Sequence, residues 1–309
     1  MSSIMMVEFL AAAVQAGTPL LLAASGEMLA ERSGIMNLGV EGMMLMGAVS
    51  GFLVTVLTGN NWWGIAAALL AGGLMALIHA LICITLRGNQ VVSGLALTIF
   101  GSGLSAFIGK GYVGTPLTDR FAAFPIPGLS EIPGIGRVLF QQDALVYLSF
   151  ILVPVLYLLL YKSSWGLALR ATGEDPAAAD ANGINVARMR YLNTFLGGAL
   201  AGLGGAYLSL AFAPAWMENM TSGRGWIALA LVIFGMWNPL WVMAGAYLFG
   251  GVEALTFRLQ TIGVTISPLF LQMLPYVLTI LVLIAAVQRR AQEAGPPAAL
   301  GLPYDREER

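Results

Sequence analysis

Residues 165–190 read WGLALRATGEDPAAADANGINVARMR, and this polar segment separates two long apolar runs near 143–161 and 191–212. An apolar run of about 20 residues is long enough to cross the hydrocarbon core of a bilayer as a helix. The polar segment carries arginines and carboxylates between these runs. We therefore expect it to connect two membrane-spanning helices outside the membrane, where another molecule can bind it.

The rest of the chain has the same apolar character. Of its 309 residues, 58% are hydrophobic and 10% are charged, whereas soluble domains carry about 25% charged residues. The runs do not alternate in polarity as the strands of a membrane β-barrel do. The sequence therefore predicts an all-α, polytopic transmembrane helical bundle. About nine spanning helices are expected, near 6–30, 38–58, 64–86, 90–109, 143–161, 191–212, 224–237, 239–258 and 269–287.

These helices are predicted to form a single transmembrane domain over residues 1–287, in which the polar connection covers about 162–190. Residues 288–309 form a polar tail that contains proline and is expected to be loosely ordered. Ten of the 15 Lys and Arg residues fall on the side of the polar connection and the tail, and five on the other side. Because basic residues are enriched in cytoplasmic loops, the connection and the C-terminus are predicted to be cytoplasmic.

The polar connection contains a short helix with a defined start and stop. Asp175 is suited to cap the first free N–H groups, and Pro176 fits the first helical position because its missing N–H costs nothing there. The alanines of the run PAAADA favour helix, and Gly183 supplies a left-handed stop. The sequence thus predicts about two turns ending near Asn182. This helix is either a docking surface for a cytoplasmic partner or an ordinary surface helix held by its neighbours.

Several blocks of residues resemble one family of membrane proteins. The stretch from Trp165 to Tyr207, with ALRA (168–171), GEDP (173–176) and GINV (183–186), resembles the cytoplasmic coupling segment of ABC-importer permeases for simple sugars and nucleosides. The blocks TPLLLA (18–23), NLGVEGMM (37–44) and NQVVSGLAL (89–97) agree in order and spacing. Together they cover most of residues 18–210. The EGMM block points towards the nucleoside-type permeases, usually the smaller of two different partner subunits.

The resemblance implies a permease subunit of an ATP-driven importer in the bacterial cytoplasmic membrane, for nucleosides or related ribose-containing solutes, or alternatively for simple sugars. It also implies a second homologous permease subunit, a cytoplasmic ATP-binding subunit and an extracytoplasmic solute-binding protein. The chain has no G-x-x-x-x-G-K-[ST] motif, so ATP and Mg would be used by the partner ATPase and no cofactor by this chain. The residues that the resemblance assigns to ATPase coupling are Arg170, Gly173, Glu174, Asp175, Pro176, Ala178, Ala179 and Gly183.

Two carboxylates on predicted helices are candidates for the solute pathway or its gating. An ionisable residue inside a membrane helix is a functional hypothesis by default and needs a partner. Glu41 is expected one turn inside a helix that Asn37 caps, and it either pairs with Arg32 or Arg87 or caps another helix end. Glu253 is expected to face the pathway or to pair with Arg258 near its helix end.

Polar residues outside the helix interiors complete the candidates. The segment 214–226 has charge, amides and indoles, and either meets a solute-binding protein, lines the mouth of the pathway or is a plain loop. A few polar groups in a mostly apolar pocket would suit a base and a sugar. The full set of pathway or gating candidates is Asn37, Glu41, Gln90, Trp216, Asn219 and Glu253.

Other functional classes find less support. An ion-coupled secondary transporter would favour buried acidic pairs and relays, and an intramembrane enzyme would need a nucleophile–base pair or a metal cluster. For the transporter, the deep ionisable residues are few: Glu41, His79 and Glu253, with Glu8 and Glu27 near segment ends. For the enzyme, one histidine, His79, and one cysteine, Cys83, leave little from which to build a site, and His79 is expected to pack in the core. The net charge of −1 does not indicate a nucleic-acid partner.

Gly47-x-x-x-Gly51 and Gly198-x-x-x-Gly202 predict close helix packing.

Overall fold

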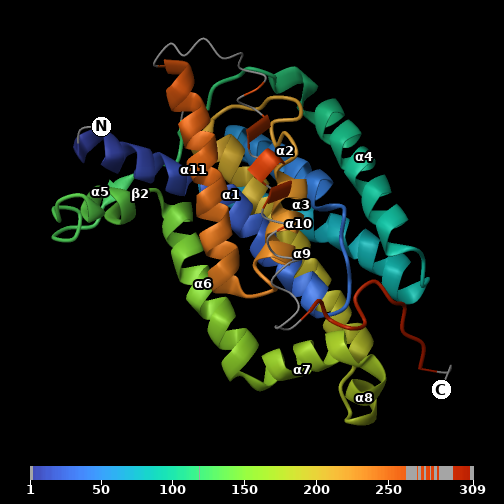
Figure 1. Cartoon of the computed structure of the whole chain (residues 1–309). Helices are drawn as coiled ribbons and strands as arrows, with labels where there is room; N and C mark the ends of the chain where they lie inside the picture. The colour runs from blue at the N-terminus through green and yellow to red at the C-terminus, as the bar shows by residue number, and fades with distance from the viewer. Residues whose placement is uncertain are drawn as a thin grey trace.

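The computed structural model describes residues 3–117, 119–261 and 295–306, together with positions 270, 273–274, 276–278, 280–281 and 284. Its elements form a helical bundle with a small two-stranded sheet beside it (Figure 1). They are, in chain order, α1 (Ser3–Arg32), α2 (Val40–Thr58), α3 (Asn61–Ala80), the π-helical η1 (Leu81–Thr85), α4 (Gln90–Gly109), the 3₁₀ turn η2 (Lys110–Tyr112), β1 (Phe124–Pro125), α5 (Ile135–Phe140), β2 (Gln141–Gln142), α6 (Ala144–Lys162), α7 (Ser164–Glu174), α8 (Pro176–Ala181), α9 (Val186–Tyr207), the π-helical η3 (Leu208–Phe212), α10 (Arg224–Phe234) and α11 (Pro239–Thr261).

Among the described residues, seven helical segments are long and apolar enough to cross a membrane. They correspond to seven of the nine predicted spans, and include α3 with η1 and α9 with η3. The helix expected over 224–237 is the 11-residue α10, which is too short for a full crossing. The helix expected over 269–287 lies largely outside the described residues, although its described positions are helical.

The centre of the bundle consists of α9 packed against α1, α2 and α3. The helices approach closely because glycines face each other across the contacts. A Cβ atom placed on Gly47 of α2 would lie 2.2 Å from the carbonyl oxygen of Gly202 on α9, and one on Gly72 of α3 would lie 2.1 Å from that of Gly198. The predicted small-residue faces therefore pack within the chain.

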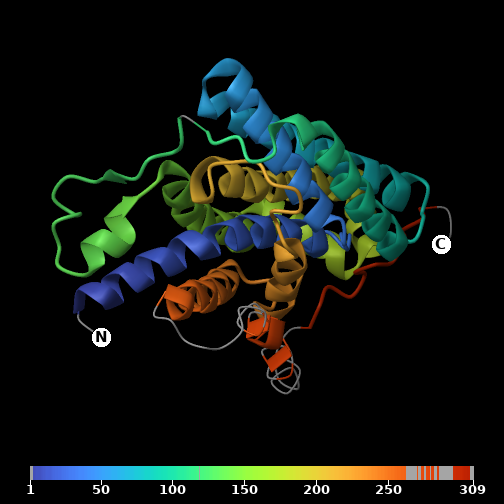
Figure 2. The same ribbon diagram turned by 90° about the horizontal axis from the view of Figure 1, so that it is seen from above.

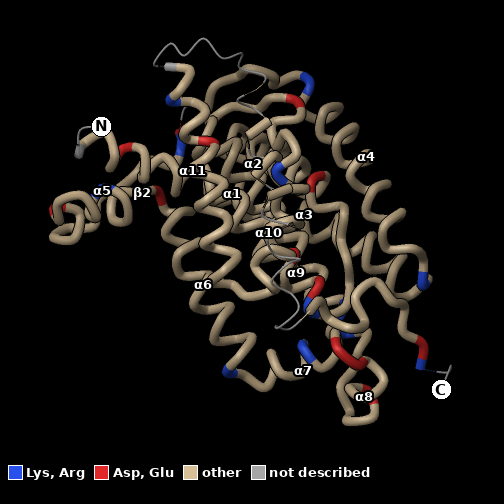
Figure 3. Tube along the Cα trace, in the orientation of Figure 1, with Lys and Arg blue, Asp and Glu red and all other residues tan. Residues whose placement is uncertain are grey.

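Helices α4, α6 and α11 lie around this centre, as Figures 1 and 2 show. Charged residues gather towards the ends of the bundle, and α4 has none along its length (Figure 3). One end holds α7, α8 and the described C-terminal segment, and we call it the α8 end. The opposite end holds the loop of residues 213–223 between η3 and α10, and we call it the loop end.

Short polar side chains set where several helices begin. Asn60 accepts a hydrogen bond from the backbone of Trp62 at the start of α3, and Asn89 accepts one from Val92 at the start of α4. Asp143 accepts two from the first turn of α6. Burial raises the pKa of the Asp143 carboxyl, while these backbone hydrogen bonds oppose the rise. Each cap satisfies N–H groups that a helix start leaves without partners.

Replacing Gly47 with alanine should destabilise the bundle, because the added methyl group would lie 2.4 Å from the Cα of Gly202. Overpacking of this kind costs about 1–3 kcal/mol. Thermal unfolding in detergent measures the effect. Gly103→Ala is the matched control, since Gly103 is exposed on α4 with no atom within 4 Å of the new Cβ. Equal melting temperatures for the two variants would show that the α2–α9 contact does not limit stability.

Candidate functional site

The short helix expected in the polar connection is present as α8, which begins at Pro176 and ends at Ala181. The Asp175 carboxylate accepts a hydrogen bond from the backbone N–H of Ala178 at 2.9 Å. Gly183 follows with a φ of 84°, the left-handed conformation that glycine adopts without strain. The local rules of helix capping thus predict this element within one residue.

The side chains of this region divide between surface and interior. Ala179 is 3% exposed and packs inside the chain, so it offers no surface to a partner in this conformation. Gly173 is also buried, and a Cβ atom there would lie 2.2 Å from the carbonyl oxygen of Arg32. Arg170 stacks over the ring of Tyr161 at 5.3 Å. The exposed members of the expected coupling set are Glu174, Asp175, Ala178 and Gly183.

A second helix, α7, precedes α8 and was not expected from the sequence. The Ser163 hydroxyl accepts a hydrogen bond from the backbone of Gly166 at 3.0 Å and caps its start. Serine before a helix-forming run is a start pattern, and it could have indicated α7 in advance. The polar connection is therefore two consecutive helices joined at Asp175.

The C-terminal tail is more ordered than expected over residues 295–306. The backbone N–H of Ala299 donates to the carbonyl oxygen of Gly173 at 2.9 Å, and that of Gly301 donates to Gly34 at 3.1 Å. The Ala298 N–H also donates to the carboxylate of Glu174 at 3.2 Å. These bonds fix the segment because its backbone pairs with the polar connection and with the loop between α1 and α2 instead of water.

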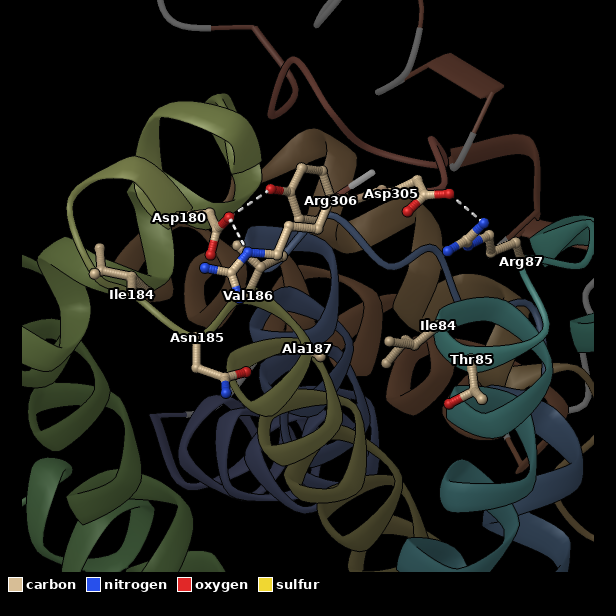
Figure 4. Close-up of a pocket in the computed structure, with 12 residues that line it drawn as sticks. Ile84, Thr85, Arg87, Asp180, Ile184, Asn185, Val186, Ala187, Asp305 and Arg306 are labelled. Carbon is tan, nitrogen blue, oxygen red and sulfur yellow. Dashed lines mark hydrogen bonds and ion pairs between the residues drawn. The ribbon is translucent and has the colours of Figure 1, made fainter. Parts of the chain in front are cut away.

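A polar cavity of about 630 Å³ lies between this segment, the start of α9 and the turn before α4 (Figure 4). Asp180 of α8 stands on one side, and Arg87 on the other. Asp305 and Arg306 lie between them, and Tyr304 also lines the cavity. The cavity holds side chains of both charges and belongs to the α8 end.

Asn37 and Gln90 also lie at the α8 end, where they hold the loop between α1 and α2. Asn37 does not cap α2 as expected, because that helix begins at Val40 and the Asn37 amide oxygen instead accepts from the Gly39 N–H at 3.0 Å. The Gln90 side chain accepts from the backbone of Met36 at 2.7 Å. Both candidates are buried, so in this conformation they support a loop.

His79 packs in the core, as expected. It is fully buried, and its ring nitrogens lie 3.0 Å from the Ser93 hydroxyl and 3.0 Å from the carbonyl oxygen of Met36. Its Nε2 atom therefore contacts the same loop that Gln90 holds, and its Nδ1 atom contacts α4.

Glu41 does not pair with Arg32 or Arg87, the two arginines expected from the sequence as its possible partners. Its carboxylate accepts hydrogen bonds from the Thr221 hydroxyl at 2.5 Å and from the backbone N–H groups of Gly223 and Gly225 at 2.8 and 2.6 Å. It thus caps the start of α10, which was the alternative expectation. The positive end of the helix dipole favours a negative charge at this position.

The two arginines are used elsewhere. Arg32 donates to the carbonyl oxygen of Trp237 at 3.3 Å, and Arg87 forms an ion pair with Asp305. The pairing of Glu41 with either arginine was therefore a wrong expectation, and neither arginine approaches the loop end.

Glu253 forms an ion pair with Arg224 at the start of α10. The expected alternative partner, Arg258, donates instead to the carbonyl oxygen of Met5 at 2.8 Å. Because Arg224 follows directly after the turn that Glu41 caps, both carboxylates hold the same part of the chain. The Nε atom of Arg224 is buried without a hydrogen-bond partner among the described residues.

The loop of residues 213–223 brings the remaining candidates together. Asn219 accepts a hydrogen bond from the Ser102 hydroxyl of α4 at 2.9 Å. Trp216 is fully buried against Gly109 at the end of α4, so it neither lines a pathway nor meets a partner in this conformation. A cavity of about 320 Å³ adjoins the loop. Its walls include Ser222, Arg224, Phe249, Glu253, Gln260 and Tyr276.

Comparison with solved structures identifies a similar fold. A TM-score of 0.51, at 17% identity over 91% of this chain and 85% of the other, relates the fold to an inward-facing conformation of a transporter described as a candidate metal-chelate type ABC transporter. At this identity the likeness concerns the fold alone.

Relatives at higher identity span almost the whole chain. TsgC13 of Haloferax volcanii, named as a candidate glucose ABC transporter permease protein, is 44% identical over 96% of this chain and 97% of its own. The guanosine ABC transporter permease protein NupQ of Bacillus subtilis is 37% identical over 93% and 92%. The nucleoside ABC transporter permease protein NupC of Lactococcus lactis is 35% identical over 86% and 88%.

The model of the family described as branched-chain amino acid transport system / permease component matches residues 9–287. This range contains all the predicted spanning helices except the first three residues of the first one, and it includes the polar connection and the loop end. The chain therefore belongs to this family and is a permease subunit of an ABC transporter.

Proposed function

We propose that this chain is the membrane-spanning subunit of an importer for nucleosides or related ribose-containing solutes. The observation that carries the proposal is the similarity to the guanosine permease NupQ along nearly the whole of both chains. The cavity at the loop end supports it, because aromatic rings beside carboxylate, guanidinium and amide groups suit a base and a sugar. A simple sugar is the second candidate substrate, and the higher identity with TsgC13 favours it.

We further propose that α8 is the coupling helix, which docks on a separate ATP-binding subunit. Its exposed surface consists of small alanine side chains next to Asp175 and Glu174, and small side chains let another surface approach closely. The partner subunit would hydrolyse ATP with Mg. The excess of basic residues on this side supports a cytoplasmic α8 end and C-terminus.

The loop end would then form the extracytoplasmic mouth of the pathway. Glu41 and Glu253 both hold the turn at the start of α10, so a change in either contact would move the lining of the 320 Å³ cavity. A solute-binding protein would deliver the solute there, and a second homologous permease subunit, as a heterodimer, would complete the pathway.

Uptake by cells that lack this gene tests the substrate. Uptake of labelled guanosine should fall to background, return when the gene is restored, and leave glucose uptake unchanged. Loss of glucose uptake with normal guanosine uptake would instead assign the chain to sugar transport.

Placing a bulky side chain on the exposed face of α8 tests its docking. Ala178→Trp should reduce the amount of ATP-binding subunit that co-purifies with the permease, and with it ATP-dependent uptake, because the indole would hold the two surfaces apart. Ala123→Trp is the control, since Ala123 is exposed on the segment after α4 and far along the chain from α8. Normal co-purification of the Ala178 variant would contradict docking through this face.

Removing the Glu41 carboxylate tests the loop end. Glu41→Ala should free the backbone of Gly223 and Gly225, because each hydrogen bond to a charged acceptor contributes about 1.5–3 kcal/mol. Faster hydrogen exchange of residues 221–225 and reduced uptake are expected. Glu218→Ala, which removes an exposed carboxylate of the same loop, should change neither. Unchanged uptake in the Glu41 variant despite faster exchange would limit Glu41 to a structural role.

A further inference from the structure

The last turn of α8 is attached to the C-terminal segment by one carboxylate. Asp180 accepts a hydrogen bond from the Tyr304 hydroxyl at 3.0 Å and an ionic contact from the Nε of Arg306 at 3.1 Å (Figure 4). The side chain of Asp180 is 12% exposed, although α8 itself lies on the surface. The carboxylate therefore points inwards, to the C-terminal segment, and away from the exposed alanine face.

The residue between these two contacts reaches in another direction. Asp305 forms an ion pair with Arg87, which lies in the turn between η1 and α4 (Figure 4). Consecutive residues of the C-terminal segment thus hold α8 on one side of the 630 Å³ cavity and the turn before α4 on the other.

The same segment is fixed to the centre of the bundle just before these contacts. Arg190 of α9 is 1% exposed, and its guanidinium donates to the carbonyl oxygens of Ser33 and Leu302, both at 3.2 Å. A buried guanidinium without partners is costly, so this side chain holds the segment in place. We call residues 297–306 the strap.

Without the strap, α8 has little to hold its orientation. It has six residues, and a helix of this length is marginal by itself. Ala179 is its buried side chain, and the chain turns sharply at Gly183 immediately afterwards. The strap supplies the polar contacts that fix the last turn of α8.

We propose that Asp180, Tyr304 and Arg306 are positioning residues for coupling, and that the Asp305–Arg87 pair transmits displacement of α8 to the start of α4. This inference rests on the proposed docking of α8 on an ATP-binding subunit. When the ATP-binding subunit moves α8, residues 304–306 of the strap, which lie beyond the Arg190 contact at Leu302, move with Asp180 and displace the turn before α4. Helix α4 begins directly after this turn. Further along the same helix, Ser102 contacts Asn219 at the loop end. The strap therefore connects the coupling helix to the far side of the membrane.

The test uses the purified complex of both permease subunits and the ATP-binding subunit in liposomes. The variant Tyr304→Phe/Arg306→Ala removes the two contacts to Asp180 described above. Because the Arg306 side chain is 78% exposed and ion pairs at the surface contribute little to folding, the complex should assemble and hydrolyse ATP. Solute transported per ATP hydrolysed should fall by roughly threefold or more, as for residues that carry coupling between sites. Arg306→Lys, with Tyr304 intact, should retain most of the coupling because it keeps the charge.

Reversal of the second ion pair gives an independent arm. Arg87→Asp alone should lower transport per ATP, and Arg87→Asp/Asp305→Arg should restore it. Arg137→Ala is the matched control, since it removes an exposed ion pair with Glu8 at 3.5 Å, outside the α8 end, and should leave the ratio unchanged.

Unchanged transport per ATP in the Tyr304/Arg306 variant would overturn the proposal, and so would a loss in the Arg87 variant that the charge reversal does not restore. A wild-type complex that does not retain the ATP-binding subunit would overturn the proposed function itself. The wild-type and variant arms therefore separate the two failures.

Discussion

Backbone-to-backbone contact between glycine-bearing helices is the constraint on which the rest of this structure depends. Lipid tails are as apolar as leucine side chains, so burial of apolar surface does not drive helices together inside a bilayer. Packing must do so, and it requires close approach. Gly47 and Gly202 meet so closely that a single methyl group does not fit, and Gly72 and Gly198 repeat the arrangement with α3. The central helices α1, α2, α3 and α9 consequently have very little freedom to move against each other.

A rigid centre concentrates conformational freedom at the two ends and at the outer helices. Helix α9 begins at Val186, directly after the turn that follows α8, and its π-helical continuation ends at Phe212, where the loop of the loop end begins. The two ends are therefore attached to one continuous helical segment, and motion between them must occur beside α9. Helix α4 is suited to this, because it touches α2 closely, through Gly42 and Gly101, and otherwise exposes much of its surface.

The parts of the fold that depend on neighbouring residues could be predicted from the sequence, and those that depend on distant residues could not. Apolar runs located seven spans, and Asp175, Pro176 and Gly183 located α8, because capping and hydrophobicity act over a few residues. The partners of Glu41 lie 180 or more residues away, and no local pattern points to them. Arg32 and Arg87 were expected instead because they are the arginines nearest to Glu41 in the sequence. The tail was expected to be loosely ordered because its composition is polar, whereas its order comes from Gly34, Gly173 and Arg190.

Arg190 explains why the tail and the α1–α2 loop have to stay together at the α8 end. Its guanidinium is buried and donates to the carbonyl oxygens of Ser33 and Leu302, with no carboxylate bonded to it among the described residues. If either carbonyl moved away, the buried charge would lose a partner that water cannot readily replace. A Cβ atom placed on Gly34 would lie 2.9 Å from a guanidinium nitrogen of Arg190. A larger residue at this position would therefore push the loop away from the arginine. The loop, the arginine and the strap consequently form a single unit, and a displacement of α8 cannot be absorbed by loosening one of them alone.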